Sequence, residues 1–484
     1  MITILISNYM PLVGNAIIAA IIRRKKRSNC MDQSKQLGEE KVSKLLLKFS
    51  IPAIIGMLVN ALYNVVDRIF IGNGVGPLGI AGITIGFPIM LVIMAFGMLI
   101  GLGANSLVSI RLGEQRKEEA ELILGNAMVL LIGVAMIISI LGLIFLEPLL
   151  RTFGASEAVL PYAKEYLNII LLGAVAQTIG FGMNNFIRAE GNPRIAMFTM
   201  LIGAILNTIL DPIFIFLFGW GIRGAAIATV LSQVVSAVWV LYYFLGGRST
   251  LKVHARNLKL RMKIVLKIFT LGTAPFLMQL AASLLNAIMN KSLTIYGGDI
   301  AVSGMGIVSS IFMLILMPIF GINQGAQPII GYNYGAHKFD RVKETLKLAI
   351  IAATTISCIG FIVTRIFPSQ LVALFSRTDE DLIDFGARAI SVFLAFLPII
   401  GFQIVSANYF QAVGKPKHSA FLSLSRQVLV LIPALLIMPR FFGLDGLLMA
   451  GPTADLTSSI ITGIFLFREL RHLDTRHEAS LAQE

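Results

Sequence analysis

Charged side chains are scarce in this sequence of 484 residues. Only 14% of the residues are Asp, Glu, Lys or Arg, against about 25% in a typical soluble domain, whereas 56% are hydrophobic. A surface that faces water on all sides cannot be built from so few charges, so the composition excludes an ordinary globular protein. It also excludes intrinsic disorder, which requires low hydrophobicity and high charge.

Cysteine and histidine are scarce as well. The two cysteines, Cys30 and Cys358, lie far apart, which excludes a disulfide framework or a cysteine-based metal cluster. The histidines all fall in or at the edge of predicted cytoplasmic loops or in the tail, which argues against a buried histidine metal site or proton relay. They are His254, His337, His418, His472 and His477. The chain has no G-x-x-x-x-G-K-[ST] motif, which argues against an ATP-driven pump.

Long apolar runs dominate the chain. A helix needs about 20 apolar residues to cross a bilayer, and strands of a membrane barrel are about half that length. Twelve stretches meet the helical requirement, at roughly 45–70, 79–110, 122–146, 160–186, 194–218, 223–246, 264–290, 301–332, 345–367, 385–411, 417–439 and 444–467. We therefore predict an all-α membrane protein with 12 transmembrane helices.

The net charge of +14 is distributed unevenly between the connecting loops. Loops on one side, together with the carboxy-terminal tail, carry 21 Lys and Arg, and the opposite loops carry nine. Cytoplasmic loops of membrane proteins are enriched in Lys and Arg, so both ends of the helical core are expected in the cytoplasm, in a multi-pass protein of the inner (plasma) membrane. No basic stretch is interleaved with aromatics, so nucleic acid is not an expected partner.

The amino-terminal segment has three interpretations. Residues 1–22 are largely apolar and a basic run, Arg23 to Arg27, follows. The segment is an extra helix, a signal-like segment, or an artefact of the assigned start site, with translation beginning at Met31. The expected organisation is an extension (1–40), an N-lobe (41–247), a hinge-like cytoplasmic linker (248–263), a C-lobe (264–468) and a cytoplasmic tail (469–484).

The two halves repeat each other at an offset of 222 or 223 residues. The matched pairs are Pro52 with Pro275, Gly113 with Gly335, Phe153 with Phe375, Gly191-x-Pro193 with Gly414-x-Pro416, and Gly221 and Gly224 with Gly443 and Gly446. Each half has six spans, so both enter the membrane from the same side. Such parallel repeats form two bundles related by an axis along the membrane normal, with the substrate path between them.

Acidic residues break this repeat. Only Asp67, Asp211 and Asp455 lie well inside predicted spans, and the first two correspond to Asn290 and Pro433 in the second half. Ionisable groups within membrane helices are costly and mark functional paths. The asymmetry predicts a cation-coupling site in the amino-terminal half.

The neighbours of these carboxylates are also oxygen-rich. Asn207 and Asp211 are four residues apart and share a helix face, and Thr229 lies early in the next span. Such hard oxygen ligands suit Na⁺, and the same pair of carboxylates could hold a proton. Structural alternatives remain for both residues: Asp67 pairs with Arg68 or caps a helix end, and Asp211 satisfies backbone groups freed by Pro212.

One further charged pair is expected to be structural. Asp455 lies inside the last span and Arg426 inside the one before it. Mutual pairing within the carboxy-terminal bundle is the favoured interpretation, over a role in transport.

Some local motifs are distinctive: Pro52 and the segments NALYNVVDRIFIG (60–72), EGNPR (190–194) and NTILDPIFIF (207–216). Together they resemble the multidrug and toxic compound extrusion (MATE) family, in its bacterial DinF/MepA-like branch. The resemblance covers residues 41–468. It implies two six-helix bundles that form a V, and antiport in which inward Na⁺ or H⁺ drives out bulky amphipathic cations.

The resemblance also implies roles for individual residues. Cation-coupling positions fall on Asp67, Asn207, Asp211 and Thr229. Substrate-contact positions fall on Asn60, Tyr63, Asn184 and Met200, and Pro52 is expected to bend the first helix. The NorM-like branch carries acidic residues in its second half; here the seventh and tenth spans have none, with Gln279 and Asn408 as examples. This difference argues against a second-half coupling site.

Three alternatives to drug antiport differ in what they require of the sequence. A flippase for lipid-linked oligosaccharide should need several basic residues within the spans, where essentially only Arg426 lies. A membrane enzyme such as a prenyltransferase needs clustered aspartates for Mg²⁺-pyrophosphate, and no such cluster faces the cytoplasm. The third alternative, a passive channel, is not excluded by the sequence. We expect no enzyme activity and no cofactor besides the coupling ion, with amphipathic cations and the lipid bilayer as partners of a monomer.

Overall fold

The computed structural model describes residues 35–375 and 379–481, and within these ranges all regular secondary structure is helical, without strands. The interpretations of the amino-terminal segment concern residues outside them. The first half contains α2 (Gln36–Glu39), α3 (Val42–Gly74), α4 (Pro77–Gly113), α5 (Lys117–Ile144), α6 (Leu146–Thr152), α7 (Leu160–Ala189), α8 (Pro193–Pro212), the π-helical turn η2 (Ile213–Leu217) and α9 (Gly221–Leu245).

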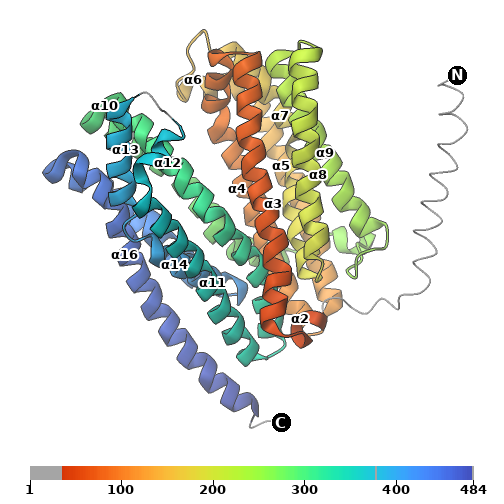
Figure 1. Cartoon of the computed structure of the whole chain (residues 1–484). Helices are drawn as coiled ribbons and strands as arrows, with labels where there is room; N and C mark the ends of the chain where they lie inside the picture. Colours follow the sequence, from red (N-terminus) through yellow and green to blue (C-terminus); the bar gives the residue numbers. More distant parts are fainter. Residues whose placement is uncertain (1–34, 376–378, 482–484) are drawn as a thin grey trace, which may run out of the picture.

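The second half follows a linker that contains the short 3₁₀ helix η3 (Ala255–Leu258). Its elements are α10 (Met262–Gly335), α11 (Phe339–Ile366), α12 (Pro368–Ala373), α13 (Glu380–Phe393), α14 (Leu397–Ala412), α15 (Pro416–Leu424), the π-helical turn η4 (Ser425–Leu431) and α16 (Ile432–Leu481). Figure 1 shows the two halves as separate bundles that lie side by side.

All twelve predicted spans are present in the described part of the chain. Ten continuous helices are long and apolar enough to cross a membrane, and the pair α13 and α14, bent by 52°, makes an eleventh. The helical run Pro416–Leu473 counts once among the ten, but its 58 residues would extend about 87 Å at 1.5 Å per residue. It breaks at Gly443 (φ 55°, ψ −136°) and therefore supplies two spans.

One span differs in form from its prediction. The tenth, expected as a single run at 385–411, consists of α13 and α14 with a turn at residues 394–396. Pro398 lies in the first turn of α14, where proline is tolerated because the first helical N–H groups have no partner within the helix.

The backbone itself repeats at the offset found in the sequence. Gln115 (φ 61°) and His337 (φ 58°) are the non-glycine residues with positive φ in the described chain, and they lie 222 residues apart. Such a backbone conformation is uncommon outside glycine, so its recurrence at equivalent turns is independent support for the internal repeat. Gly221 (φ 52°) and Gly443 (φ 55°) form a second pair at the same offset.

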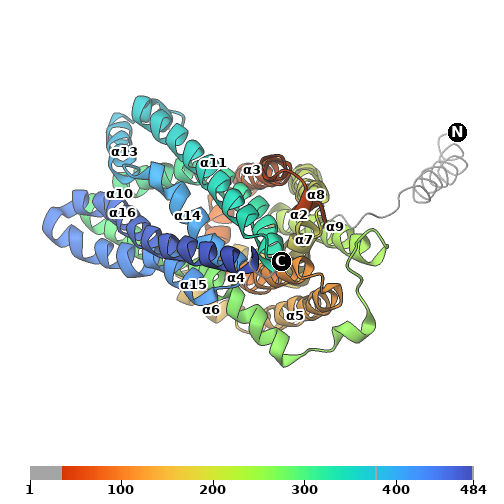
Figure 2. The same cartoon turned by 90° about the horizontal axis from the view of Figure 1, so that it is seen from below.

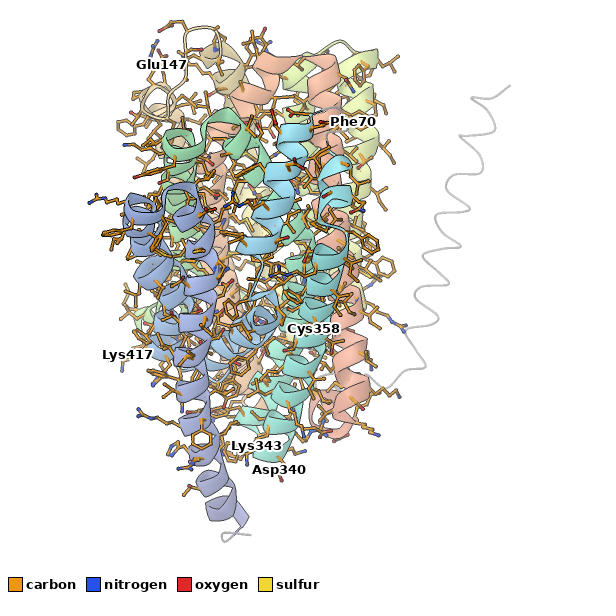
Figure 3. The ribbon with its side chains drawn as sticks, turned by 60° about the vertical axis from the view of Figure 1, so that its left-hand side comes forward. Phe70, Glu147, Asp340, Lys343, Cys358 and Lys417 are labelled. Atoms are coloured by element: carbon orange, nitrogen blue, oxygen red, sulfur yellow. The ribbon has the colours of Figure 1, made fainter. Side chains whose placement is uncertain are left out.

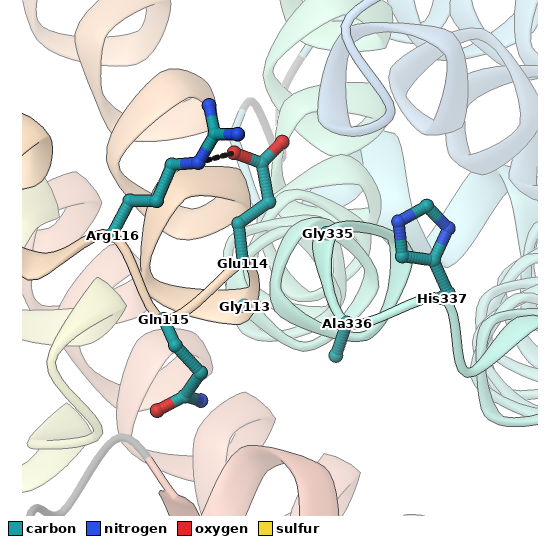
Figure 4. Close-up of a pocket in the computed structure, with 7 residues that line it drawn as sticks. All are labelled: Gly113, Glu114, Gln115, Arg116, Gly335, Ala336 and His337. Carbon is teal, nitrogen blue, oxygen red and sulfur yellow. Dashed lines mark ion pairs between the residues drawn. The ribbon is translucent and has the colours of Figure 1, made fainter.

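The two bundles meet where these turns lie. Figure 4 shows the turn after α4 beside the turn after α10. A Cβ on Gly113 would overlap the Tyr332 carbonyl oxygen, and a Cβ on Gly335 would overlap that of Ile110. The two backbones therefore touch directly, and only glycine fits at either position.

Further contacts between the bundles lie along the same part of the molecule. A Cβ on Gly272 would overlap the Leu99 carbonyl oxygen, and the rings of Phe96 and Phe276 are 5.0 Å apart. Toward the opposite end the bundles diverge, as Figure 1 shows, which gives the molecule a V shape.

Charged side chains lie at both ends of the V. Figure 3 shows Glu147 at one end, Asp340 and Lys343 at the other, and Cys358 between them on α11. Ile359 and Ile362, next to Cys358, are exposed apolar side chains. An apolar belt between two charged rims is the surface expected of a protein that spans a bilayer.

Candidate functional site

The predicted cation-coupling residues lie together in the first bundle. Asp67 comes from α3, Asn207 and Asp211 from α8, and Thr229 from α9. The Asn207 amide donates to the Asp211 carboxylate at 3.1 Å and to the Thr229 hydroxyl at 3.3 Å. The carboxyl groups of Asp67 and Asp211 lie within side-chain hydrogen-bonding distance of each other.

The site contains more acceptors than donors. Asp67 Oδ1, Asn207 Oδ1 and Asp211 Oδ2 are buried and have no hydrogen-bond partner among the described residues. Buried polar atoms are normally hydrogen-bonded, because leaving one unsatisfied costs about 1–3 kcal/mol. Two carboxyl groups in contact also need a proton or a cation between them. The arrangement therefore fits a bound cation or proton.

Small residues of α3 allow it to approach α8. A Cβ on Gly74 would overlap Ile215 Cγ2, and a Cβ on Gly56 would lie 2.7 Å from Met200 Sδ. The two glycines lie on either side of Asp67 along α3. Close packing at both positions brings the Asp67 carboxyl to α8 at the level of Asp211.

Neither structural alternative for Asp67 describes its main contact. Asp67 lies inside α3 and caps neither of its ends. Arg68 is exposed and near enough to attract the Asp67 charge, but no ion pair joins the two in the described part of the chain. The Asp67 carboxyl is directed to Asp211 instead.

Tyr166 of α7 is a site residue that the sequence did not reveal. Its side chain is buried, and it lies close enough to Thr229, Asp67 and Asp211 to interact with them electrostatically. A tyrosine in an apolar helix is usually an ordinary core residue, so composition gave no signal. It completes a wall of the site between α7 and α9.

The predicted substrate-contact residues lie at two levels. Tyr63 of α3 lies near both carboxylates, and the Asn60 side chain, one turn earlier, is exposed. Met200 lies eleven positions before Asp211, about 16 Å away along α8 at 1.5 Å per residue. The Oδ1 atom of Asn184 is buried without a partner among the described residues.

A buried arginine lies at the second level. Arg188 donates to Asn185 Oδ1 at 2.8 Å, and its other terminal nitrogen lies 3.7 Å from Met200 Sδ. The predicted fourth span ended at residue 186, whereas α7 continues to Ala189. Arg188 therefore lies in the last turn of a span and not in a loop, and Arg426 is not alone as a basic residue within the spans.

The second bundle contains a buried ion pair, called the closed pair below because each charge has its partner. Arg426 donates to Asp455 at 2.6 Å, and its guanidinium carbon lies 5.8 Å from the centre of the Phe312 ring. The predicted pairing of these two residues is confirmed. Among the described residues, no group of three His, Cys, Asp or Glu could hold a metal ion.

A family model matches the chain in two stretches. The MatE model matches residues 52–213 and again residues 275–436, which together make up more than half of the sequence. The chain belongs to the MatE family. The two stretches are 223 residues apart, as in the sequence repeat, and the MatE family consists of membrane transporters and not enzymes.

Curated relatives of this MatE protein match nearly its whole length. The multidrug export protein MepA of Staphylococcus aureus (strain MSSA476) is 28% identical over 438 residues, which cover 90% of this chain and 96% of that protein. MepA of Staphylococcus haemolyticus (strain JCSC1435) is 28% identical over 445 residues, covering 92% and 97%.

Solved structures of MatE proteins share its fold. The MATE multidrug transporter DinF-BH is 43% identical with a TM-score of 0.84 and covers 90% of this chain and 98% of its own. An outward-facing multidrug resistance MATE transporter of the MOP superfamily is 27% identical with a TM-score of 0.86, covering 91% and 98%. The chain is therefore a multi-pass membrane transporter, and the membrane-enzyme alternative is excluded.

Proposed function

We propose that this transporter is a multidrug efflux protein that exports bulky amphipathic, mostly cationic drugs in exchange for Na⁺ or H⁺. The observation that carries the proposal is the cluster of buried, unpartnered oxygens at Asp67, Asn207 and Asp211. The names of its relatives, multidrug export protein and multidrug transporter, support the choice of cargo.

The coupling follows from differential binding. A ligand shifts a conformational equilibrium only if it binds one state better than the other. A cation between Asp67 and Asp211 neutralises two carboxylates that lie on different helices, α3 and α8. Its binding therefore stabilises one packing of α3 against α8, and drug binding stabilises the other. The linkage is reciprocal, so each ligand drives release of the other.

The proposed orientation places the joined end of the V in the cytoplasm. The basic loops and the ends of the helical core lie at that end, in an inner (plasma) membrane, and the diverging ends open outward. Pro52 lies inside α3, which runs as one helix from Val42 to Gly74. We assign it the role of a bending point between the joined end and the cation site. The N-lobe (41–247) and C-lobe (264–468) move as the two bodies of a monomer.

The test is efflux of a fluorescent amphipathic cation from everted vesicles. A Na⁺ gradient and a pH gradient are imposed separately, so that the coupling ion is identified by the gradient that drives transport. Asp211→Asn should abolish gradient-driven efflux with unchanged protein in the membrane. Asp445→Asn, which neutralises an exposed carboxylate paired with Arg388, is the matched control and should transport normally. Normal efflux by Asp211→Asn would refute the coupling site.

A further inference from the structure

The linker between the bundles has an unusual charge composition. No acidic residue occurs between Asp211 and Asp299. The linker and the first turns of α10 nevertheless carry seven basic residues: Arg248, Lys252, Arg256, Lys259, Arg261, Lys263 and Lys267. Local sequence therefore provides no partner for these cations.

Other basic residues at the same end of the molecule have acidic partners. Arg111 pairs with Glu114 and with Glu119, the latter at 3.1 Å. Lys415 pairs with Glu469 at 2.5 Å. In contrast, no ion pair is recorded in the described chain for any of six linker cations. These are Lys252, Arg256, Lys259, Arg261, Lys263 and Lys267.

The linker is not a free tether, because buried acceptors of the first bundle hold its backbone. Glu190 accepts from the Leu251 N–H at 2.8 Å and from the Ser249 hydroxyl. Glu121 accepts from the Lys252 N–H at 3.0 Å.

Asn126 of α5 holds the second part of the linker. Its amide donates to the carbonyls of Asn257 (3.0 Å) and Lys259 (3.2 Å), and its Oδ1 accepts from the Arg261 N–H at 2.7 Å. Figure 2 shows the resulting path, in which the chain runs from α9 around the outside of α5 toward α10. The linker cations are thus presented on a rigid support at the edge of the molecule.

Apolar side chains are exposed among these cations. Leu258, Leu260, Met262 and Leu266 are exposed by 36%, 51%, 68% and 58%. Met262 begins α10, whose first part is a membrane span. The segment from Leu258 to Lys263 therefore alternates apolar and basic residues at the level where a helix enters the bilayer. Alternating apolar and basic contacts suit a membrane interface, where acyl chains and headgroups meet.

We propose that this linker surface, formed by Lys252, Arg256, Lys259, Arg261 and Lys263 with Leu258, Leu260 and Met262, binds the headgroups of anionic phospholipids. The orientation proposed above places these phospholipids in the cytoplasmic leaflet. The rest of the lipid-binding proposal does not depend on the transport function. Because the linker is fixed to the first bundle, headgroup binding would hold that bundle at one depth while the second bundle moves. The apolar members favour a lipid over a nucleic acid or a free phosphate.

The experiment titrates the purified full-length transporter in detergent with dioleoyl phosphatidylglycerol and follows its thermal unfolding. The wild type should be stabilised by phosphatidylglycerol and not by phosphatidylcholine or inorganic phosphate. The variant Lys259→Gln/Arg261→Gln/Lys263→Gln should shift the midpoint of the titration to about 100-fold higher lipid, since each basic residue near an anionic surface contributes about fivefold.

A matched variant removes three charges elsewhere at the same end. Lys117→Gln/Lys347→Gln/Lys417→Gln changes exposed lysines in the first turns of α5, α11 and α15 and should keep the wild-type midpoint. Equal midpoints for the two triple variants, no response of the wild type to phosphatidylglycerol, or an equal response to inorganic phosphate would each overturn the proposal. Transport of the fluorescent cation is a separate readout, so a failed lipid titration is distinguishable from a failed function.

Discussion

The two bundles share a backbone but place their buried charges in opposite ways. Equivalent turns at Gln115 and His337 have the same uncommon φ. In the first bundle two carboxyls, Asp67 and Asp211, face each other, and no described basic side chain forms an ion pair with either. In the second bundle the carboxylate of Asp455 is closed by Arg426 at 2.6 Å.

The Arg426–Asp455 pair therefore stabilises the fold, whereas Asp67 and Asp211 are arranged to bind a ligand. A buried ion pair already compensates both of its charges and has no site for a further ion. Two buried carboxyls without such compensation are stabilised when they bind a cation or a proton. Duplication of the scaffold therefore does not imply duplication of the ion site, because Asn290 and Pro433 occupy the positions equivalent to Asp67 and Asp211.

The largest expected effect breaks the closed pair of the second bundle. Arg426→Met leaves Asp455 buried without a partner, which should lower the free energy of unfolding by about 3–5 kcal/mol. Thermal unfolding in detergent measures the loss. The double variant Arg426→Met/Asp455→Leu should recover most of it, and a double variant as unstable as the single one would contradict a purely structural pair.

Neutralising Asp67 or Asp211 in the first bundle should reduce transport without reducing stability. Asp67→Asn and Asp211→Asn should each lower gradient-driven efflux by about 100-fold, at the upper end of typical coupling energies. Their stability should not fall, because each change removes a buried charge that has no basic partner. Efflux and unfolding are measured on the same preparation, and a loss of stability matching that of Arg426→Met would remove the contrast between the bundles.

A third prediction concerns Glu190, which lies just after α7 and holds the linker. Burial raises the pKa of Glu190 to about 6, against an ordinary value of 4.5, although hydrogen bonds from Ser249, Tyr243 and the linker backbone oppose the shift. The folded state then holds a proton that the unfolded chain releases. Its contribution to the free energy of unfolding should fall by about 2 kcal/mol as the pH rises from about 4 to 7.

Glu190→Gln tests this dependence because it keeps the size of the side chain and one acceptor oxygen. The variant should lose the decline in stability between about pH 4 and 7 while the wild type shows it. Thermal unfolding of both proteins is measured across that pH range. Identical pH profiles for the two proteins would argue against a titrating Glu190.

The smallest expected difference lies between two equivalent glycines. Gly113→Ala and Gly335→Ala each force a Cβ against a carbonyl oxygen of the other bundle, at a cost of about 1–3 kcal/mol for overpacking. Because each glycine meets the backbone of the opposite bundle in the same way, the two costs should agree to within about 1 kcal/mol. Thermal unfolding measures both, and a clear inequality would show that the shared scaffold is not mechanically symmetric.

Local and periodic properties of the sequence predicted most of the fold. Span length depends on apolar content alone, and the repeat depends on spacing. The juxtaposition of Asn207 and Asp211 follows from helical geometry. Asp67 and Asp211 both lie late in spans that run in the same direction, which places them at a similar depth in the membrane, and the family resemblance assigned both to one cation site.

What the sequence did not predict depends on contacts between distant segments. Tyr166 joins the site only because α7 packs beside α9. Arg188 is buried because α7 continues three residues beyond the predicted end of the fourth span. The linker is held by Glu121 and Asn126, more than 130 positions earlier in the chain. No periodicity links residues at such separations, so only the folded arrangement brings them together.

The direct backbone contact at Gly113 also has a mechanical consequence. Gly113 is the last residue of α4, a helix of 37 residues and hence about 55 Å long. The contact is therefore a fulcrum with a long lever arm: a rotation of about 10° around it displaces the far end of α4 by about 10 Å. A backbone contact at one end of so long a helix would convert a small angular change into a displacement the size of a drug molecule.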